Sequence, residues 1–192
     1  MLIWINGAHG AGKTSVARRL AALRADAFIL DPEQIGFMLR RIWPEGGPPD
    51  FQDMPAWREL TVATLRAASA DRPAATLVVP MTLANPLHHA EIIGGLRAAG
   101  MDVRHFTLLA SPATLRRRIR RRLDWPLSRR WALSRVEACS AALEDPAFAD
   151  HIATDGLGVA EVAAKILTRV EAAATAPRTA PAASGGMPPP HS

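Results

Sequence analysis

The sequence has a single cysteine, Cys139, among its 192 residues. An intrachain disulfide is therefore impossible, which fits a reducing compartment such as the cytoplasm. No apolar run approaches the ~20 residues that a helix needs to cross a bilayer. The first residues also show no basic stretch followed by an apolar one, so we expect no signal peptide. These features favour a cytoplasmic protein, and the chain is long enough for one domain with its own hydrophobic core.

Lysine is almost as scarce, since Lys13 and Lys165 are the only lysines among 23 basic residues. Nine arginines lie between Arg116 and Arg135, so the formal net charge of +5 is concentrated in one segment. Such a segment can bind nucleotide phosphates, an anionic membrane or nucleic acid, or it can be a solvated helix face. Aromatic residues are sparse in it, and no DNA- or RNA-binding motif is present. We interpret it as part of a nucleotide site and expect no nucleic-acid partner.

What the sequence does contain is a complete phosphate-binding loop of the form G-x-x-x-x-G-K-[ST], from Gly7 to Thr14. Its glycines allow a tight turn whose backbone N–H groups face phosphate oxygens. Lys13 can reach the β- and γ-phosphates of ATP, and the Thr14 hydroxyl can ligate Mg²⁺. An apolar strand precedes the loop and an amphipathic helix follows it, as the motif requires. The residues expected to contact the nucleotide are Gly7, Ala8, His9, Gly10, Ala11, Gly12, Lys13, Thr14 and Ser15.

Apolar strands alternate with helical segments along the chain. We expect strands at 2–5, 27–30, 76–80, 103–109 and 151–154, and helices at 14–23, 33–42, 55–70, 86–100, 112–123, 130–143 and 159–173. Short apolar strands that alternate with helices are typical of a parallel sheet covered on both faces. The prediction is an α/β P-loop NTPase fold with a five-stranded parallel sheet, in one domain over residues 1–173. The Ala/Pro-rich segment 174–192 has almost no apolar bulk, so we expect a disordered tail.

Ligands of open parallel sheets bind beyond the carboxyl ends of the strands, and this rule singles out three residues. Asp31 follows the second strand, and its carboxylate can take the proton of a substrate hydroxyl or help hold Mg²⁺ through water. Aspartate before proline is also a common turn residue. Met81 and Thr82 follow the third strand and can line an acceptor pocket, although Met81 equally fits the core. No acidic residue follows this strand, where many P-loop enzymes place an aspartate that orients Mg²⁺. Thr14 is therefore the predicted metal ligand.

Several arginines are candidates for phosphate contacts. Arg118 and Arg122 lie four residues apart on one face of a predicted helix, and can stabilise the charge of a transferring phosphoryl group. Closure of a lid over residues 116–131 would exclude water and bring positive charge to the phosphates. The alternative is a basic helix that faces solvent. Arg40, on the helix after the second strand, can bind an anionic acceptor or lie on the surface.

Together these segments resemble the bacterial tunicamycin-resistance ATP-binding protein family. The resemblance runs from about Leu2 to Leu167 and rests on the phosphate loop, Asp31-Pro32-Glu33 with Gly36-Phe37, Val79-Pro80-Met81-Thr82, His105–Leu108 and Asp150–Asp155. It implies ATP binding and a lidded fold similar to nucleoside and small-molecule kinases. It also implies protection against tunicamycin, a nucleoside antibiotic built on uridine and aminosugars, with Phe37 among the acceptor-binding residues. Such proteins are thought to associate with membranes through a C-terminal amphipathic helix. The Pro/Ala-rich tail departs from that pattern, which argues against membrane association here.

The leading hypothesis is an ATP-dependent phosphotransferase that acts on tunicamycin or a related nucleoside or sugar, with ATP and Mg²⁺ as cofactors. In this hypothesis Lys13 holds the β- and γ-phosphates, and Asp31 orients or deprotonates the acceptor hydroxyl. Arg118 and Arg122 stabilise the transferring charge. Two alternatives stay open. One is a non-enzymatic, ATP-dependent protein that sequesters the antibiotic, and the other is a kinase for an ordinary small metabolite.

Overall fold

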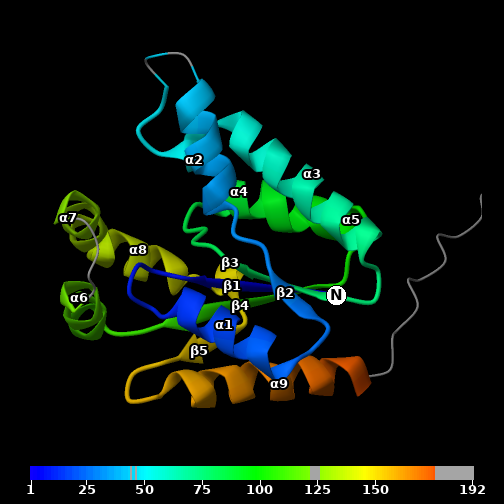
Figure 1. Ribbon diagram of the computed structural model, residues 1–192. Coiled ribbons are helices and arrows are strands. Elements are labelled where there is room, and N and C mark those ends of the chain that lie inside the picture. The colour runs from blue at the N-terminus through cyan, green and yellow to red at the C-terminus, as the bar shows by residue number, and fades with distance from the viewer. Residues whose placement is uncertain (44, 46, 122–125, 176–192) are drawn as a thin grey trace, which may run out of the picture.

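The computed structural model describes residues 1–43, 45, 47–121 and 126–175. A five-stranded parallel sheet lies at its centre, with the strand order β2-β3-β1-β4-β5 (Figure 1). The strands are β1 (Leu2–Gly7), β2 (Ala27–Ile29), β3 (Thr76–Pro80), β4 (Val103–Leu109) and β5 (His151–Ala153). The central strands are buried on both faces, as the apolar runs predicted. The expected α/β fold with a parallel sheet is thereby confirmed.

Helices cover both faces of this sheet. In Figure 1, α1 and α9 lie below it, and α2, α3, α4 and α5 lie above it. The remaining helices, α6, α7 and α8, gather beyond one side of the sheet, where the basic segment lies. The bounds are α1 (Lys13–Leu23), α2 (Glu33–Ile42), α3 (Pro55–Asp71), α4 (Pro86–His89), α5 (Gly95–Ala98), α6 (Pro112–Arg120), α7 (Pro126–Ser134), α8 (Val136–Leu143) and α9 (Val159–Thr175), with a 3₁₀ turn η1 (Phe51–Asp53), a π-helical turn η2 (Ala90–Gly94) between α4 and α5, and a 3₁₀ turn η3 (Pro146–Phe148).

The alternation of side chains along β1 builds two separate cores. Ile3 and Ile5 point to one face, where they join a cluster that includes Leu20 of α1 and Ile166 of α9. Leu2 and Trp4 point to the other face, in a cluster with residues of α3 and η2. The carboxyl end of β1 is thus held from both sides, and the phosphate loop that follows it starts from a rigid base.

Several boundaries differ from the sequence prediction. Helix α6 ends at Arg120 and α7 begins at Pro126, whereas the sequence predicted helices up to residue 123 and from residue 130. The helix expected over 130–143 is two helices, α7 and α8, which are separated at Arg135. The helix expected over 86–100 contains the π-helical turn η2. Ala174 and Thr175, expected in the tail, belong to α9. The rest of the expected tail, 176–192, and the lid residues 122–125 lie outside the described residues.

Within residues 1–43, 45, 47–121 and 126–175, no helix combines the length and the apolar character needed to cross a bilayer.

Candidate functional site

The phosphate loop has the backbone that its glycines predict. Gly10 and Gly12 adopt φ angles of 85° and 100°, which lie in the left-handed region that favours glycine. A Cβ atom on Gly10 would lie 2.9 Å from the carbonyl oxygen of Leu115 in α6, so the loop also packs closely against that helix. The loop therefore tolerates no side chain at this position without a shift of the backbone.

Asn6 is the residue that fixes the start of the loop, and sequence reasoning missed it. Its side chain is fully buried. The Oδ1 atom accepts hydrogen bonds from the backbone N–H of Gly7 and of Leu83, each at 2.8 Å. The Nδ2 atom donates to the carbonyl of Leu83 at 2.8 Å. An asparagine within the otherwise apolar strand Leu2–Gly7 was the available signal, because a buried amide is stable only when it is hydrogen-bonded.

His105 in β4 completes this network. Its Nε2 atom lies 3.3 Å from Asn6 Nδ2, and its Nδ1 atom lies 3.1 Å from the carbonyl oxygen of Ala149. The amide nitrogen of Asn6 can only donate, so Nε2 accepts and Nδ1–H donates to Ala149. Burial lowers the pKa of His105 from 6.5 to about 4. The imidazole is therefore neutral at pH 7 and has one defined tautomer.

Lys13 and Thr82 meet at the carbonyl oxygen of Gly7. The Lys13 ammonium donates to this oxygen at 2.8 Å and to the carbonyl of Ala8 at 3.2 Å. The buried Thr82 hydroxyl donates to the same Gly7 oxygen at 2.8 Å. Lys13 therefore lies within the loop, and Thr82 ties the loop to the residues after β3.

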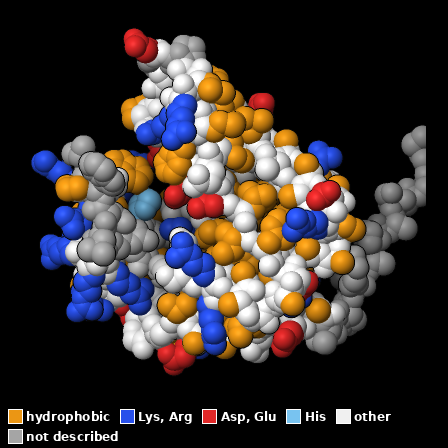
Figure 2. Space-filling view, viewed as in Figure 1, with side chains coloured by type: hydrophobic (Ala, Val, Ile, Leu, Met, Phe, Trp, Pro, Cys, Tyr) orange, Lys and Arg blue, Asp and Glu red, His pale blue; other side chains and the backbone are white. Residues whose placement is uncertain are grey.

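A main cavity of about 550 Å³ opens beside the loop. It brings the loop together with all five residues predicted to bind the acceptor, and its wall includes His9, Gly10, Gly12, Lys13, Thr14, Asp31, Phe37, Arg40, Met81 and Thr82. The wall also includes residues to which sequence reasoning gave no site role, among them Glu33, Asp50, Phe51, Gln52 and Trp131. Lys and Arg side chains gather beside the hollowed front of the molecule, over α6 and α7 (Figure 2).

The acceptor side of the cavity is built around the start of α2. Asp31 Oδ1 accepts the backbone N–H of Glu33 at 3.0 Å, so Asp31 is a turn residue as well as a cavity residue. The Arg40 guanidinium donates to the carbonyl of Pro49 and lies over the ring of Phe51. Phe51 in turn contacts Phe37, with ring centroids 6.2 Å apart. Asp31 is therefore a turn residue whose side chain lines the cavity, and Arg40 belongs to the cavity wall.

Arg118, a predicted lid arginine, and Arg135, which follows the predicted lid, contact different parts of the site. Arg118 donates to the carbonyl of Ala11 at 3.4 Å and to the carbonyl and hydroxyl of Thr154 at 3.0 and 3.2 Å. It thus joins the phosphate loop to the turn after β5. Arg135 pairs with Asp50 at 3.1 Å and lies over the indole of Trp131, which connects the α7–α8 region to the acceptor side. Arg122 lies outside the described residues.

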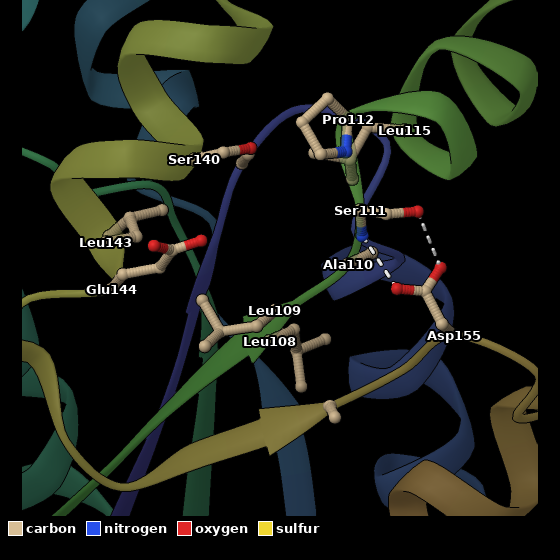
Figure 3. Close-up of a pocket in the computed structure, with 12 residues that line it drawn as sticks. Leu108, Leu109, Ala110, Ser111, Pro112, Leu115, Ser140, Leu143, Glu144 and Asp155 are labelled. Carbon is tan, nitrogen blue, oxygen red and sulfur yellow. Dashed lines mark hydrogen bonds between the residues drawn. The ribbon is translucent and has the colours of Figure 1, made fainter.

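A smaller cavity of about 210 Å³ lies behind the loop, between β4, α6 and α8 (Figure 3). At its edge the backbone N–H of Ser111 donates to Asp155 at 2.7 Å, and the Ser111 hydroxyl donates to the same carboxylate at 3.1 Å. The turn 154–157 is thereby attached to the start of α6. Across residues 1–43, 45, 47–121 and 126–175, no cluster of three His, Cys, Asp or Glu side chains is suited to hold a metal ion.

Comparison with known proteins assigns a family to this geometry. The profile of the AAA domain family matches residues 2–145. The solved tunicamycin resistance protein of Deinococcus radiodurans is 33% identical and superposes with a TM-score of 0.73, over 88% of this chain and 94% of that chain. The chain belongs to the tunicamycin-resistance protein family. This tunicamycin-resistance family member therefore has the kinase-like P-loop fold that the motifs implied.

More distant solved structures share the fold of this family member. An APS kinase of Mycobacterium tuberculosis, solved with AMPPNP and APS, is 18% identical with a TM-score of 0.58, over 88% of this chain and 96% of that chain. A shikimate kinase of Acinetobacter baumannii, solved with shikimate, is 20% identical with a TM-score of 0.58, over 91% of this chain and 94% of that chain. Among curated protein sequences, none matches.

Proposed function

We propose that this protein transfers the γ-phosphoryl group of ATP to a hydroxyl of tunicamycin or of a related nucleoside or sugar. The observation that carries the proposal is the main cavity, in which the phosphate loop forms one wall and Asp31, Phe37 and Arg40 form another. Phosphoryl transfer depends on the positioning of two substrates and on the stabilisation of charge, and needs little covalent chemistry from the protein. A cavity that both groups line supplies this positioning.

The residues on the nucleotide side fit a triphosphate with Mg²⁺. The Lys13 ammonium bonds to two loop carbonyls and can exchange them for phosphate oxygens. Thr14 is exposed in the first turn of α1 and lines the cavity. Mg²⁺ keeps several waters and needs only one or two protein ligands besides phosphate oxygens, so one threonine hydroxyl is a sufficient contribution. When bound, the metal neutralises charge on the phosphates.

On the acceptor side, Asp31 would orient the substrate hydroxyl and take its proton. A bond forms between the hydroxyl oxygen and the γ-phosphorus while the bond from that phosphorus to the bridging oxygen breaks. The products are ADP and a phosphate ester. The lid proposed over 116–131 would close the cavity through Trp131, which already lines it. Arg118 and Arg122 keep their proposed role in stabilising the phosphates.

The test is direct. Purified protein, ATP, Mg²⁺ and tunicamycin should yield the drug with one added phosphoryl group, detected by mass spectrometry. Asp31→Asn should retain tunicamycin affinity and lose about 10²–10⁴-fold in kcat, the range of general-base effects. Asp71→Asn, at the exposed end of α3, is the matched control and should behave as the wild type. Absence of phosphorylated drug with the wild type contradicts the proposal.

A non-enzymatic protein that sequesters the antibiotic is the second candidate. The observation in its favour is the hydrogen bond from Glu33 N–H to Asp31, because a turn role is sufficient to explain this aspartate. A sequestering protein should bind tunicamycin equally well with Asp31→Asn and should still protect cells that express it. Loss of protection with unchanged drug affinity favours the phosphotransferase.

A further inference from the structure

A side chamber of about 390 Å³ adjoins the main cavity. The two cavities share five wall residues, so they are parts of one cleft, and the shared residues are His9, Asp50, Gln52, Thr82 and Trp131. The chamber continues past these residues to the start of α4 on one side and to α8 on the other. An acceptor bound in the main cavity therefore has room to extend in one direction.

The chamber has two chemically different walls. One carries hydrogen-bonding side chains from η1 and from the start of α4, which are Gln52, Asp53, Asn85 and His88. The Nδ1 atom of His88 is buried and makes no hydrogen bond within the described residues. The other wall carries the indole of Trp131 and three small side chains of α8, which are Ala138, Cys139 and Ala142. A polar wall opposite an apolar one suits a ring with hydroxyl groups at its edge and C–H groups on its face.

The charges in the chamber disfavour an anionic ligand. Asp50 is paired with Arg135 at 3.1 Å, so these two charges offset each other. Burial, followed by the nearby Arg58, lowers the pKa of His88, which leaves its imidazole neutral at pH 7. Asp53 contributes a further carboxylate, 3.9 Å from His88 Nε2. A phosphate group there would meet net negative charge.

We propose that the side chamber binds a second, non-anionic sugar-like unit of the acceptor, while the reacting hydroxyl lies in the main cavity. This inference rests on the proposed function, because it assumes that the main cavity binds the acceptor. Binding in the side chamber would make Ala138 and Ala142 specificity-determining residues, since their small side chains leave the chamber open. Acceptors with two linked polyhydroxylated units should bind more tightly than either unit alone, because the second unit adds contacts at little extra entropic cost.

Cys139 provides a readout that needs no turnover. It is the only cysteine of the chain and lines the chamber, so its alkylation reports on occupancy. Burial raises the pKa of its thiol, so N-ethylmaleimide labelling is best followed at about pH 8.5, near the ordinary cysteine pKa. Tunicamycin should slow labelling at least tenfold, whereas uridine or N-acetylglucosamine at the same concentration should slow it much less, because a single unit binds more weakly. Equal labelling rates with and without saturating tunicamycin overturn the proposal.

A matched pair of variants tests the same point by calorimetry. Ala138→Trp fills the chamber and should weaken tunicamycin binding at least tenfold. Ala141→Trp places the same side chain at an exposed position of α8 that does not line the chamber, and should bind tunicamycin as the wild type does. Equal affinities for the two variants, or a wild type that does not bind tunicamycin, overturn the proposal. If tunicamycin protects Cys139 but no phosphorylated drug forms, the side-chamber proposal stands and only the proposed phosphotransferase activity is contradicted.

Discussion

Lys13 Nζ and Thr82 Oγ1 donate to the same carbonyl oxygen of Gly7, each at 2.8 Å. Nucleotide binding would change the position of only one of these two donors. Lys13 would have to move to the phosphates, whereas Thr82 is buried on a rigid segment after β3 and can remain. Thr82 therefore keeps the Gly7 carbonyl satisfied in both states, which holds the loop in the form that receives the phosphates.

The first prediction concerns this hydroxyl. Thr82→Val keeps the shape of the side chain and removes the donor, so the loop should lose about 1 kcal/mol of support, or roughly fivefold in ATP affinity. Titration calorimetry with ATP and Mg²⁺ measures the effect. Thr82→Ser retains the hydroxyl and is the control. Unchanged affinity in Thr82→Val would show that Lys13 alone maintains the loop.

Asn6 should matter more for stability than for binding. Asn6→Ala removes three hydrogen bonds at 2.8 Å and leaves the N–H of Gly7 and both backbone groups of Leu83 without a partner. Buried groups left in this way each cost about 1–3 kcal/mol, so we expect a loss of about 3 kcal/mol or more in the free energy of unfolding. Urea denaturation measures it. The control is Asn85→Ala at the exposed cap of α4, where a loss of about 1 kcal/mol is expected. Equal losses in the two variants contradict the prediction.

The main cavity was largely predictable, because parallel strands bring their carboxyl ends to one edge of the sheet. This rule placed Asp31 after β2 and Met81 and Thr82 after β3 beside the phosphate loop, and the structure shows all three on its wall. The family resemblance added Phe37, which contacts Phe51. Local spacing and topology were sufficient for Asp31, Met81 and Thr82, because each lies one or two residues after the end of its own strand.

The remaining contacts depend on partners that are far away in the chain. Asp50 and Arg135 pair across 85 residues, and nothing in the sequence near either residue indicates the other. The side chamber lies between α8 and the start of α4, two elements far apart in the chain, and no periodicity specifies where they come to lie. Arg118 lies on a helix, α6, as predicted, but its bonds to Ala11 and Thr154 required the tertiary structure.

Stability should depend on pH through His105. The folded state lowers its pKa from 6.5 to about 4, so between these values the unfolded chain binds the proton more readily. The contribution of neutral His105 to the free energy of unfolding is fully present above pH 6.5 and is lost as the pH falls toward 4. The drop in pKa corresponds to about 3 kcal/mol, since each unit is about 1.4 kcal/mol. Urea denaturation from pH 7 to pH 4 measures it.

The control for this prediction is His105→Gln, which removes the titrating group. His88 and His89 also have lowered pKa values, mainly because of burial. They change the pH dependence of stability in the same direction, and they do so in both the wild type and the variant. The difference between the wild type and His105→Gln therefore isolates His105. Its stability should change less steeply with pH, and parallel pH profiles would show that His105 is not the sensitive group.

A substitution at Arg118 distinguishes a role in positioning the phosphate loop from a role in catalysis alone. Its guanidinium bonds to Ala11 and Thr154 while partly buried, so Arg118→Ala should lower the free energy of unfolding by about 1–3 kcal/mol. It should also weaken ATP binding, because Ala11 belongs to the phosphate loop. Arg120→Ala removes an exposed arginine from the same helix and should change stability by less than about 0.5 kcal/mol. If Arg118 acted only on the transferring phosphoryl group, Arg118→Ala would lower kcat and leave both stability and ATP affinity intact.

Urea denaturation, ATP titration and the rate of drug phosphorylation, measured on the same two variants, distinguish these outcomes.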